Sequence, residues 1–290
     1  MTAAVQAALS GAMIGGLYAI MALGLSVSWG LLRIINLAHF GLILLAAYLT
    51  FQITTSTGVD PLLTVLVAAP VFFLIGVALH WVVDRFEVSE FNSLLASFGL
   101  LLVMVQAITN IWSADFQRIP TSQNAYAASS VTIAGIALPV PRILAFTVAV
   151  LIAVAARYVL TSTYAGKALR AVGQDRQIAA AYGIDPTRIA TVVAGLSAAT
   201  AAVAGTLVGI SSGIFPELAF EWFGIVFTVV ILGGIGNVLG AVGAGLLVGA
   251  LSGLVATVWQ PTLAPLITFL VLVLALLFRP HGLLGGGRHS

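Results

Sequence analysis

Residues 222–278 read WFGIVFTVVILGGIGNVLGAVGAGLLVGALSGLVATVWQPTLAPLITFLVLVLALLF, a run of 57 residues without a charged side chain. A helix that crosses a membrane needs about 20 mainly apolar residues, because the hydrocarbon core is about 30 Å thick. The run is therefore too long for one or two untilted helices. The glycine cluster from Gly233 to Gly236 and the pair Gln260–Pro261 divide it, so we predict three membrane-spanning helices here.

The remainder of the chain is divided into apolar intervals in the same way. Only 7% of its 290 residues are charged and 61% are apolar, whereas soluble domains carry about a quarter charged residues. We therefore expect residues 1–290 to form a single all-α domain, a polytopic transmembrane helical bundle of eight to nine spans. Half-helices near Asn36 or Gly233 would change the count. The six further intervals that could span are 2–32, 34–59, 61–83, 91–114, about 143–160 and 189–211.

The uncharged interval 119–141 is not expected to span the membrane. It contains three prolines and several hydroxyl and amide side chains. A run this polar, with this many helix breakers, cannot satisfy its backbone groups in lipid. We place it in a water-facing loop, which could hold a short hairpin.

The distribution of Lys and Arg predicts how the chain crosses the membrane. With the N-terminus outside, nine basic residues lie on the cytoplasmic side and only Arg118 and Arg142 lie outside. Two spans within 222–278 would reduce that ratio to seven against four, so we prefer nine spans. The first segment lacks a basic n-region, and we interpret it as a retained helix rather than a signal peptide. We expect a multi-pass protein of a bacterial inner membrane.

The residue types disfavour several functions. Without cysteine there is no disulfide framework, thiolate metal site or cysteine nucleophile, and a net charge of +2 does not favour nucleic acid. No zinc-binding His-Glu-x-x-His and no phosphate-binding Gly-x-x-x-x-Gly-Lys motif occurs. Away from the predicted span ends no Asp or Glu lies in the membrane, which disfavours an enzyme, a metal site and a carboxylate-coupled secondary transporter. Sodium coordination by carbonyl groups stays open.

The segment 161–187 is predicted to be a structured cytoplasmic loop between the fifth and sixth spans. A first short helix is expected at 167–172, ended by Gly173. A second helix is expected at 176–182, with Asp175 as its N-cap. Because so few turns are unstable alone in water, these helices need a partner surface.

The second short helix carries features of a docking element. Ile178 and Tyr182 lie one turn apart as apolar anchors, and Ala179–Ala181 allow close approach of another surface. Gly183 can end the helix in a left-handed conformation. A simpler interpretation is a basic loop that only fixes orientation, but the dense capping favours a docked element.

Polar residues near the span ends allow two interpretations. Asn36 and His39 lie one helical turn apart, so both could line a solute path. Alternatively, Asn36 caps the second span and His39 lies at the membrane interface, which is the interpretation we prefer. We interpret His80, Gln106 and Asn110 as interfacial.

The glycines of the long apolar run also allow two interpretations. Gly233, Gly234 and Gly236 could break a helix at a site that flexes or exposes carbonyl groups to a solute. From Gly236 to Gly253, however, small residues recur every four positions, which permits close packing of helices. Packing is the simpler of the two.

Four stretches together resemble the branched-chain amino acid permease family of ABC importers, specifically the smaller membrane subunit of the high-affinity systems. The loop 161–187 is similar to the EAA-type coupling loop of such permeases. The stretches extend over nearly the whole chain, and their joint occurrence in this order is specific. They are GLYAIMALGL (16–25) continuing to IINLAH (34–39), GKALRA (166–171) with AAAYGI (179–184), LGGIGN (232–237) with Gly240–Ala241, and RPHGLLG (279–285).

The resemblance implies a non-enzymatic permease subunit that forms a translocation path with a second, longer permease subunit. It also implies two cytosolic ATP-binding subunits and an external solute-binding protein, so ATP is used by partners and this chain binds no cofactor. Membrane lipid is an expected partner and nucleic acid is not. The expected substrates are branched-chain or other small amino acids. Urea or short amides, which relatives also handle, and ion-coupled secondary transport are the alternatives.

The resemblance assigns contact with the ATPase to residues of the loop, and departs from the family pattern at two places. Where the EAA-type pattern has glutamate this chain has Gln177, which could still form a hydrogen bond. After His39, Phe40 intervenes before Gly41 and no acid follows, so no acid-dependent role is expected there. The candidate coupling residues are Gly166, Lys167, Leu169, Arg170, Gln177, Ala179, Ala180, Tyr182 and Gly183; the candidate path residues are Asn36, His39, Gly233, Gly234 and Gly236.

Overall fold

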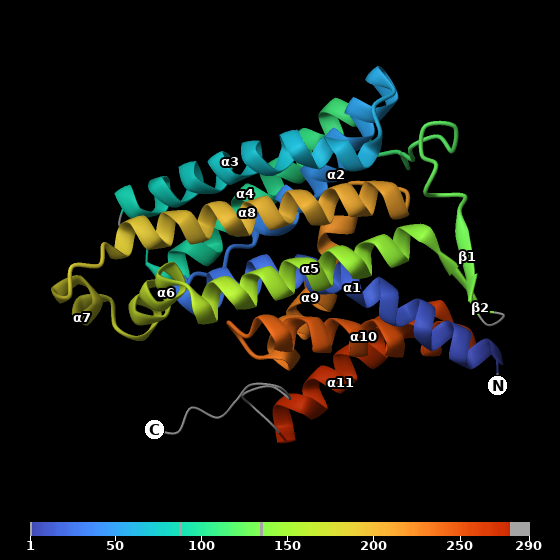
Figure 1. Cartoon of the computed structure of the whole chain (residues 1–290). Helices are drawn as coiled ribbons and strands as arrows, with labels where there is room; N and C mark the ends of the chain where they lie inside the picture. Colours follow the sequence, from blue (N-terminus) through green and yellow to red (C-terminus); the bar gives the residue numbers. More distant parts are fainter. Residues whose placement is uncertain (1, 87–88, 134–135, 279–290) are drawn as a thin grey trace.

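The computed structural model describes residues 2–86, 89–133 and 136–278 (Figure 1). Within these ranges one apolar helix lies at each of the nine predicted spans. Seven of them are long and apolar enough to cross a membrane, whereas α9 and α11 have only 16 and 15 residues. The structure agrees with the predicted transmembrane helical bundle. The helices are α1 (Thr2–Leu32), α2 (Ala38–Thr57), α3 (Val65–Arg85), α4 (Glu90–Trp112), α5 (Val140–Ser162), α8 (Pro186–Ser211), α9 (Leu218–Gly233), α10 (Val238–Val258) and α11 (Ala264–Phe278), with the 3-10 turns η1 (Pro61–Thr64) and η2 (Pro261–Leu263).

Helices α1 and α10 pack antiparallel with their backbones in direct contact. A Cβ atom on Gly245 of α10 would lie 2.6 Å from the carbonyl oxygen of Gly15 on α1. A Cβ atom on Gly253 would lie 2.5 Å from the carbonyl oxygen of Ala7. These distances leave no room for a side chain, so the small residues at four-residue spacing serve helix packing, as the simpler interpretation predicted.

Helix α8 packs against both α2 and α3 in the interior of the bundle (Figure 1). A Cβ atom on Gly205 of α8 would lie 2.6 Å from that of Ala46 on α2. Nearby, the hydroxyl of Thr50 shares hydrogen bonds with Thr206 of α8, at 3.0 Å, and with Thr64 of η1, at 3.1 Å. All three threonines are buried, so these bonds satisfy hydroxyl groups that water does not reach.

One end of the bundle carries a hairpin in the segment predicted to be a polar loop. Strands β1 (Ser130–Ile133) and β2 (Ile136–Pro139) pair antiparallel, with Val131 opposite Leu138. The loop before them is tied to the helices, because Asn124 Nδ2 donates to the carbonyl oxygen of Ile210 at 3.0 Å. The hairpin that the sequence allowed in this loop is confirmed.

The opposite end carries two short helices, α6 (Tyr164–Gln174) and α7 (Arg176–Ala181) (Figure 1). The prediction that Gly173 ends the first helix is wrong: α6 runs on to Gln174 and starts earlier, at Tyr164. The first turn begins at Tyr164 because the Thr163 side chain caps it, accepting from the amide of Gly166 at 3.1 Å.

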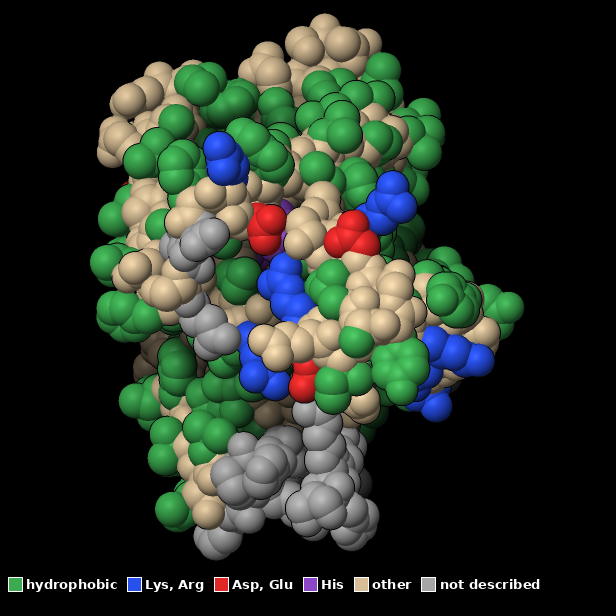
Figure 2. All heavy atoms as spheres, turned by 90° about the vertical axis from the view of Figure 1, so that its left-hand side faces the viewer, with side chains coloured by type: hydrophobic (Ala, Val, Ile, Leu, Met, Phe, Trp, Pro, Cys, Tyr) green, Lys and Arg blue, Asp and Glu red, His purple; other side chains and the backbone are tan. Residues whose placement is uncertain are grey.

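Basic side chains gather at the α6–α7 end of the bundle. Figure 2 shows this end face-on, with Lys and Arg side chains spread from its centre to its edges among a few Asp and Glu side chains. Of the Lys and Arg residues that the structure describes, only Arg118 and Arg142 lie at the hairpin end; Arg279 and Arg288 fall outside the described ranges. The seven at the α6–α7 end are Arg33, Arg85, Arg157, Lys167, Arg170, Arg176 and Arg188.

Candidate functional site

The loop between α5 and α8 is built by successive side-chain caps. Asp175 Oδ1 accepts from the amides of Gln177 and Ile178, at 2.8 and 2.9 Å, and so starts α7. Gly183 has φ +80°, the left-handed conformation predicted for it. Asp185 Oδ1 then accepts from the amide of Thr187 at 3.0 Å and starts α8. The predicted second helix of the loop is confirmed, with its start at Arg176 and its last residue at Ala181, one residue before the predicted end.

The candidate coupling residues divide into an inward and an outward set. Gly166 is buried, and a Cβ atom there would lie 2.6 Å from Cα of Leu160 on α5. Ala179 is buried and Leu169 half-buried, so these three hold the loop against the bundle. The outward set is exposed and consists of Lys167, Arg170, Gln177, Ala180, Tyr182 and Gly183.

Three apolar side chains of the α6–α7 loop are exposed. Tyr182 is 84% exposed, Tyr164 80% and Ile178 58%. Large apolar side chains grouped on a surface that faces water mark a site of interaction with another protein. Ile178 and Tyr182 are the predicted anchors; Tyr164, which lies outside the expected first helix, was not predicted.

Helix α7 is linked to α3 and α8 by polar contacts. One guanidinium nitrogen of Arg176 lies 3.7 Å from Oδ1 of Asp84 on α3 and donates to the Thr187 hydroxyl of α8 at 3.2 Å. Beneath the loop lies an open cavity of about 400 Å³, whose walls include Gly173, Asp175 and Arg176. Movement of α7 would therefore act directly on the ends of two long helices.

Asn36 and His39 lie inside the bundle and not at its surface. The span predicted from residue 34 begins as a helix only at Ala38, whose amide donates to Asn36 Oδ1 at 3.1 Å. Asn36 thus accepts from the first amide of α2 from a position one residue before the N-cap Leu37, which is close to the capping role that the preferred interpretation gave it. His39 is fully buried, and its Nε2 donates to the carbonyl oxygen of Met21 at 3.0 Å, so the structure does not place it at an interface.

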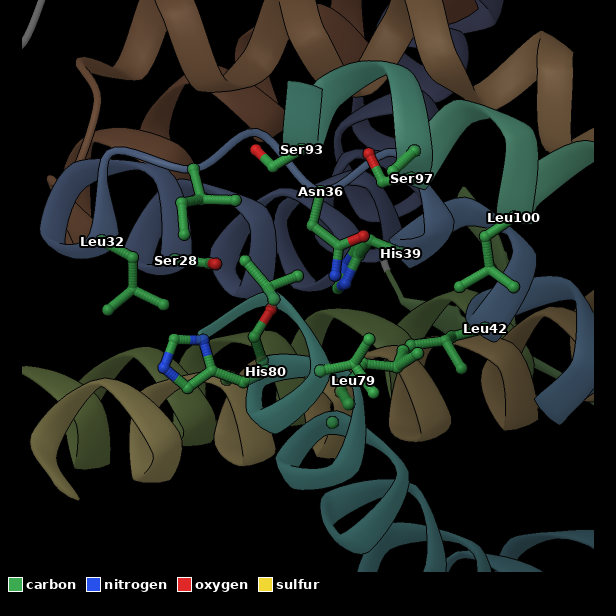
Figure 3. A pocket seen from close by; sticks show the side chains of 18 residues that line it. Ser28, Leu32, Asn36, His39, Leu42, Leu79, His80, Ser93, Ser97 and Leu100 are labelled. Carbon is green, nitrogen blue, oxygen red and sulfur yellow. The ribbon is translucent and has the colours of Figure 1, made fainter. Parts of the chain in front are cut away.

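Both residues also line a cavity of about 350 Å³ between α1, α2, α3, α4 and α8. Figure 3 shows Asn36 and His39 in its centre, with His80 of α3 opposite Ser93 and Ser97 of α4. The two sequence interpretations are therefore compatible: Asn36 accepts from the first amide of α2 and also faces the cavity.

Ser97 holds the non-helical residues that precede α2. Its hydroxyl accepts from the amide of Leu37 at 3.0 Å and lies 3.3 Å from the carbonyl oxygen of Ile35. We expect Ser97→Ala to lower the free energy of unfolding by about 1–2 kcal/mol, because a buried amide loses its acceptor. Thermal unfolding in detergent measures this. Ser56→Ala, at an exposed hydroxyl on α2, is the matched control and should leave the melting temperature unchanged.

The three candidate path glycines lie elsewhere. Gly233 ends α9, and a Cβ atom there would lie 2.5 Å from the carbonyl carbon of Gly240. Gly234 and Gly236 have φ +85° and +79°, which glycine adopts at no steric cost, and the amide of Gly236 donates to Ser26 Oγ at 3.0 Å. They form a tight turn between α9 and α10, and in the described part of the chain they line neither cavity named above.

Comparison with known proteins agrees with this architecture. A family model described as the permease component of a branched-chain amino acid transport system matches residues 7–276. The chain belongs to this family. The high-affinity branched-chain amino acid transport system permease protein BraD of Pseudomonas aeruginosa is 28% identical over 294 residues, which cover 97% of this chain and 95% of BraD. The corresponding LivH proteins of Salmonella typhimurium and Escherichia coli K12 are each 26% identical, with the same coverage. No solved structure matches significantly.

The permease is accordingly a multi-pass membrane protein and a component of a transport system. Three of the four stretches that carry the resemblance lie in α1 to α2, in the α6–α7 loop and at the turn between α9 and α10. The fourth, residues 279–285, lies outside the described residues.

For His80, as for His39, the interfacial interpretation did not foresee burial within the bundle. His80 is buried and lines both cavities. The buried positions of α3 are Ala68, Phe72, Gly76 and His80. This four-residue spacing places His80 on the packed face of the helix, and it was the signal that could have located the residue.

Proposed function

We propose that this permease is the membrane subunit of an ATP-driven ABC importer for branched-chain or other small amino acids. The observation that carries the proposal is the α6–α7 loop, whose capped helices present Tyr164, Ile178 and Tyr182 to water at the basic end of the bundle. The relatives with 26–28% identity, whose names specify branched-chain amino acid transport, support the substrate class.

The proposed orientation follows from the charges. The basic α6–α7 end lies in the cytoplasm and the hairpin end, with the N-terminus, lies outside. Two cytosolic ATP-binding subunits dock on the loop, and an external solute-binding protein delivers the amino acid at the hairpin end. A second, longer permease subunit completes the translocation path. The ATP is bound and hydrolysed by the partner subunits.

Coupling in this proposal runs through α7. A docked ATPase subunit that moves α7 also moves Arg176, which contacts Asp84 of α3 and Thr187 of α8. Helix α8 is fixed to the loop by its Asp185 cap, so a displacement of the loop shifts its first turn. Both α3 and α8 line the cavity of about 350 Å³ that contains Asn36 and His39, which we call the inner cavity. Displacement of these helices would open or close it.

Reconstitution tests the proposal. The chain is co-purified with the ATP-binding proteins and the longer permease encoded next to it, and is placed in proteoliposomes with the binding protein. We expect uptake of radiolabelled leucine that requires ATP, persists without a sodium or proton gradient and is not reduced by excess urea or acetamide. Uptake that follows an ion gradient without ATP would contradict the proposal in favour of a secondary transporter.

A further inference from the structure

Helix α2 begins far inside the bundle. His39 in its first turn contacts Met21 of α1, yet α1 continues from residue 21 to residue 32. At about 1.5 Å per residue, α1 extends roughly 16 Å beyond the start of α2. Helix α8 does the same, because Ser197 donates to the carbonyl oxygen of Gly24 at 2.9 Å and lies eleven residues after Pro186, where α8 starts.

Between the start of α2 and the α6–α7 end of the bundle, the chain that leads into α2 is not helical. Residues 33–37 form this non-helical segment. Non-helical backbone at membrane depth is tolerated only where protein covers it or where it lines a cavity. Here Ile34 and Asn36 line the cavity of about 350 Å³, a volume at the lower end of pockets that hold one small molecule.

The lining of this cavity is amphipathic and without charge. Among the described residues that form its walls there is no Asp, Glu, Lys or Arg. In Figure 3, Leu42 and Leu100 lie at the right and Leu79 lies near the centre, whereas Ser28 and His80 lie at the left together with Leu32. Such a lining suits a small solute without net charge that has an aliphatic part and a group able to form hydrogen bonds.

His80 at the polar end forms no hydrogen bond within the described ranges. It is only 8% exposed, and its Nε2 is buried without a partner. Buried polar atoms are almost always hydrogen-bonded, so an unpaired imidazole beside a cavity points to a partner that arrives with a ligand. His80, Leu32 and Ile34 also line the cavity beneath the α6–α7 loop. The imidazole therefore lies where the inner cavity meets the outer one.

We propose that the inner cavity is a holding site for one aliphatic amino acid within this subunit. His80 and Ser28 lie at the polar end of the solute, Asn36 lies at the centre of the cavity, and Leu42, Leu79 and Leu100 surround the aliphatic side chain. This inference rests on the proposed function and adds the site, the orientation of the solute and the residues that select it. A zwitterion has no net charge, and its aliphatic side chain matches the leucines.

The cavity opens between α3 and α4. Val82 of α3, 43% exposed, and Ala96 of α4, also exposed, belong to its walls. Since a zwitterion cannot cross lipid, this opening has to face protein or water in the assembled transporter. The second permease subunit provides that surface, so the solute enters the cavity from the path that the two subunits share.

Two pairs of variants in the reconstituted transporter test the site. His80→Leu removes the imidazole, and we expect kcat/KM for leucine uptake to fall roughly tenfold or more, with partial recovery in His80→Gln. Leu79→Ala enlarges the aliphatic end, and we expect the ratio of phenylalanine to valine uptake to rise by about tenfold. Leu74→Ala is the control for Leu79→Ala, because Leu74 lies on the same helix, is 65% exposed and is not part of the cavity wall.

The selectivity ratio separates a solute site from a structural role, because a merely destabilised protein loses uptake of both amino acids alike. Two results together would overturn the holding site and leave the proposed function intact. The assembled His80→Leu transporter would take up leucine as the wild type does, and the Leu79→Ala transporter would show the wild-type ratio of phenylalanine to valine uptake. Absence of any ATP-dependent amino acid uptake by the wild-type complex would instead refute the proposed function, and the holding site with it.

Discussion

Replacement of Gly15 by alanine is expected to destabilise the bundle, whereas the same replacement at Gly99 is expected to stabilise it slightly or leave it unchanged. A Cβ atom on Gly15 would lie 2.7 Å from the carbonyl carbon of Gly245 and 2.8 Å from Cα of Leu246. Both are backbone atoms, so no side chain can move aside and α1 has to separate from α10. Overpacking of this kind costs about 1–3 kcal/mol or more.

Gly99 on α4 is the matched control, because a Cβ atom there meets nothing within 4 Å. Alanine at such a helical position gains up to about 1 kcal/mol over glycine. Thermal unfolding of the purified protein in detergent should show an apparent melting temperature roughly 3–10 °C lower for Gly15→Ala than for the parent. Equal melting temperatures for the two variants would mean that the α1–α10 contact is not between backbones.

A second variant tests whether the destabilisation comes from this one contact. Gly245→Ala places its Cβ 2.6 Å from the carbonyl oxygen of Gly15, so it separates the same two backbones. Once α1 and α10 have moved apart, the second alanine costs little more. We therefore expect the double variant to lose less stability than the sum of the single ones, as is typical of residues in direct contact.

Much of this fold could be predicted from the positions of charges and helix breakers. Apolar runs with little or no charge, together with the helix breakers within 222–278, located all nine apolar helices, and the polar residues of 119–141 distinguished the hairpin loop from a span. The caps Asp175 and Asp185 and the left-handed Gly183 were predictable because their geometry depends on residues within the same turn. Gly173 was misjudged because a glycine inside a helix costs only about 1 kcal/mol, which packing can override.

The inner cavity could not be predicted in this way, because it depends on contacts between distant segments. Nothing in the hydropathy of residues 33–37 shows that they are non-helical; that conformation is supported by Ser97, 60 residues further along the chain. The role of His80 depends likewise on how α3 faces α4. Hydropathy shows that a span exists but not at which depth in the bundle its helix begins. Here the cavity exists because α2 begins deep in the bundle.

The α6–α7 loop is where the second large effect is expected. Tyr182 is 84% exposed at the end of α7, and Ile178 lies one turn before it at 58%. Aromatic side chains that insert into a partner commonly account for 2 kcal/mol or more of binding. We therefore expect Tyr182→Ala to raise the dissociation constant for the ATP-binding subunits by roughly 30-fold or more. Titration of the ATP-binding subunits onto the permeases in lipid nanodiscs measures this dissociation constant.

Tyr158→Ala is the matched control. Tyr158 is 65% exposed on α5, but it lies in an apolar membrane-spanning helix, so its loss should leave the affinity unchanged. ATP hydrolysis by the isolated ATP-binding subunits gives the basal rate, because the permease is absent from that assay. Solute-stimulated hydrolysis by the complex should disappear with Tyr182→Ala alone. Were Tyr182→Ala to bind and stimulate like Tyr158→Ala, the loop would be a basic segment that only fixes orientation, and the energy of ATP would have to reach the helices elsewhere.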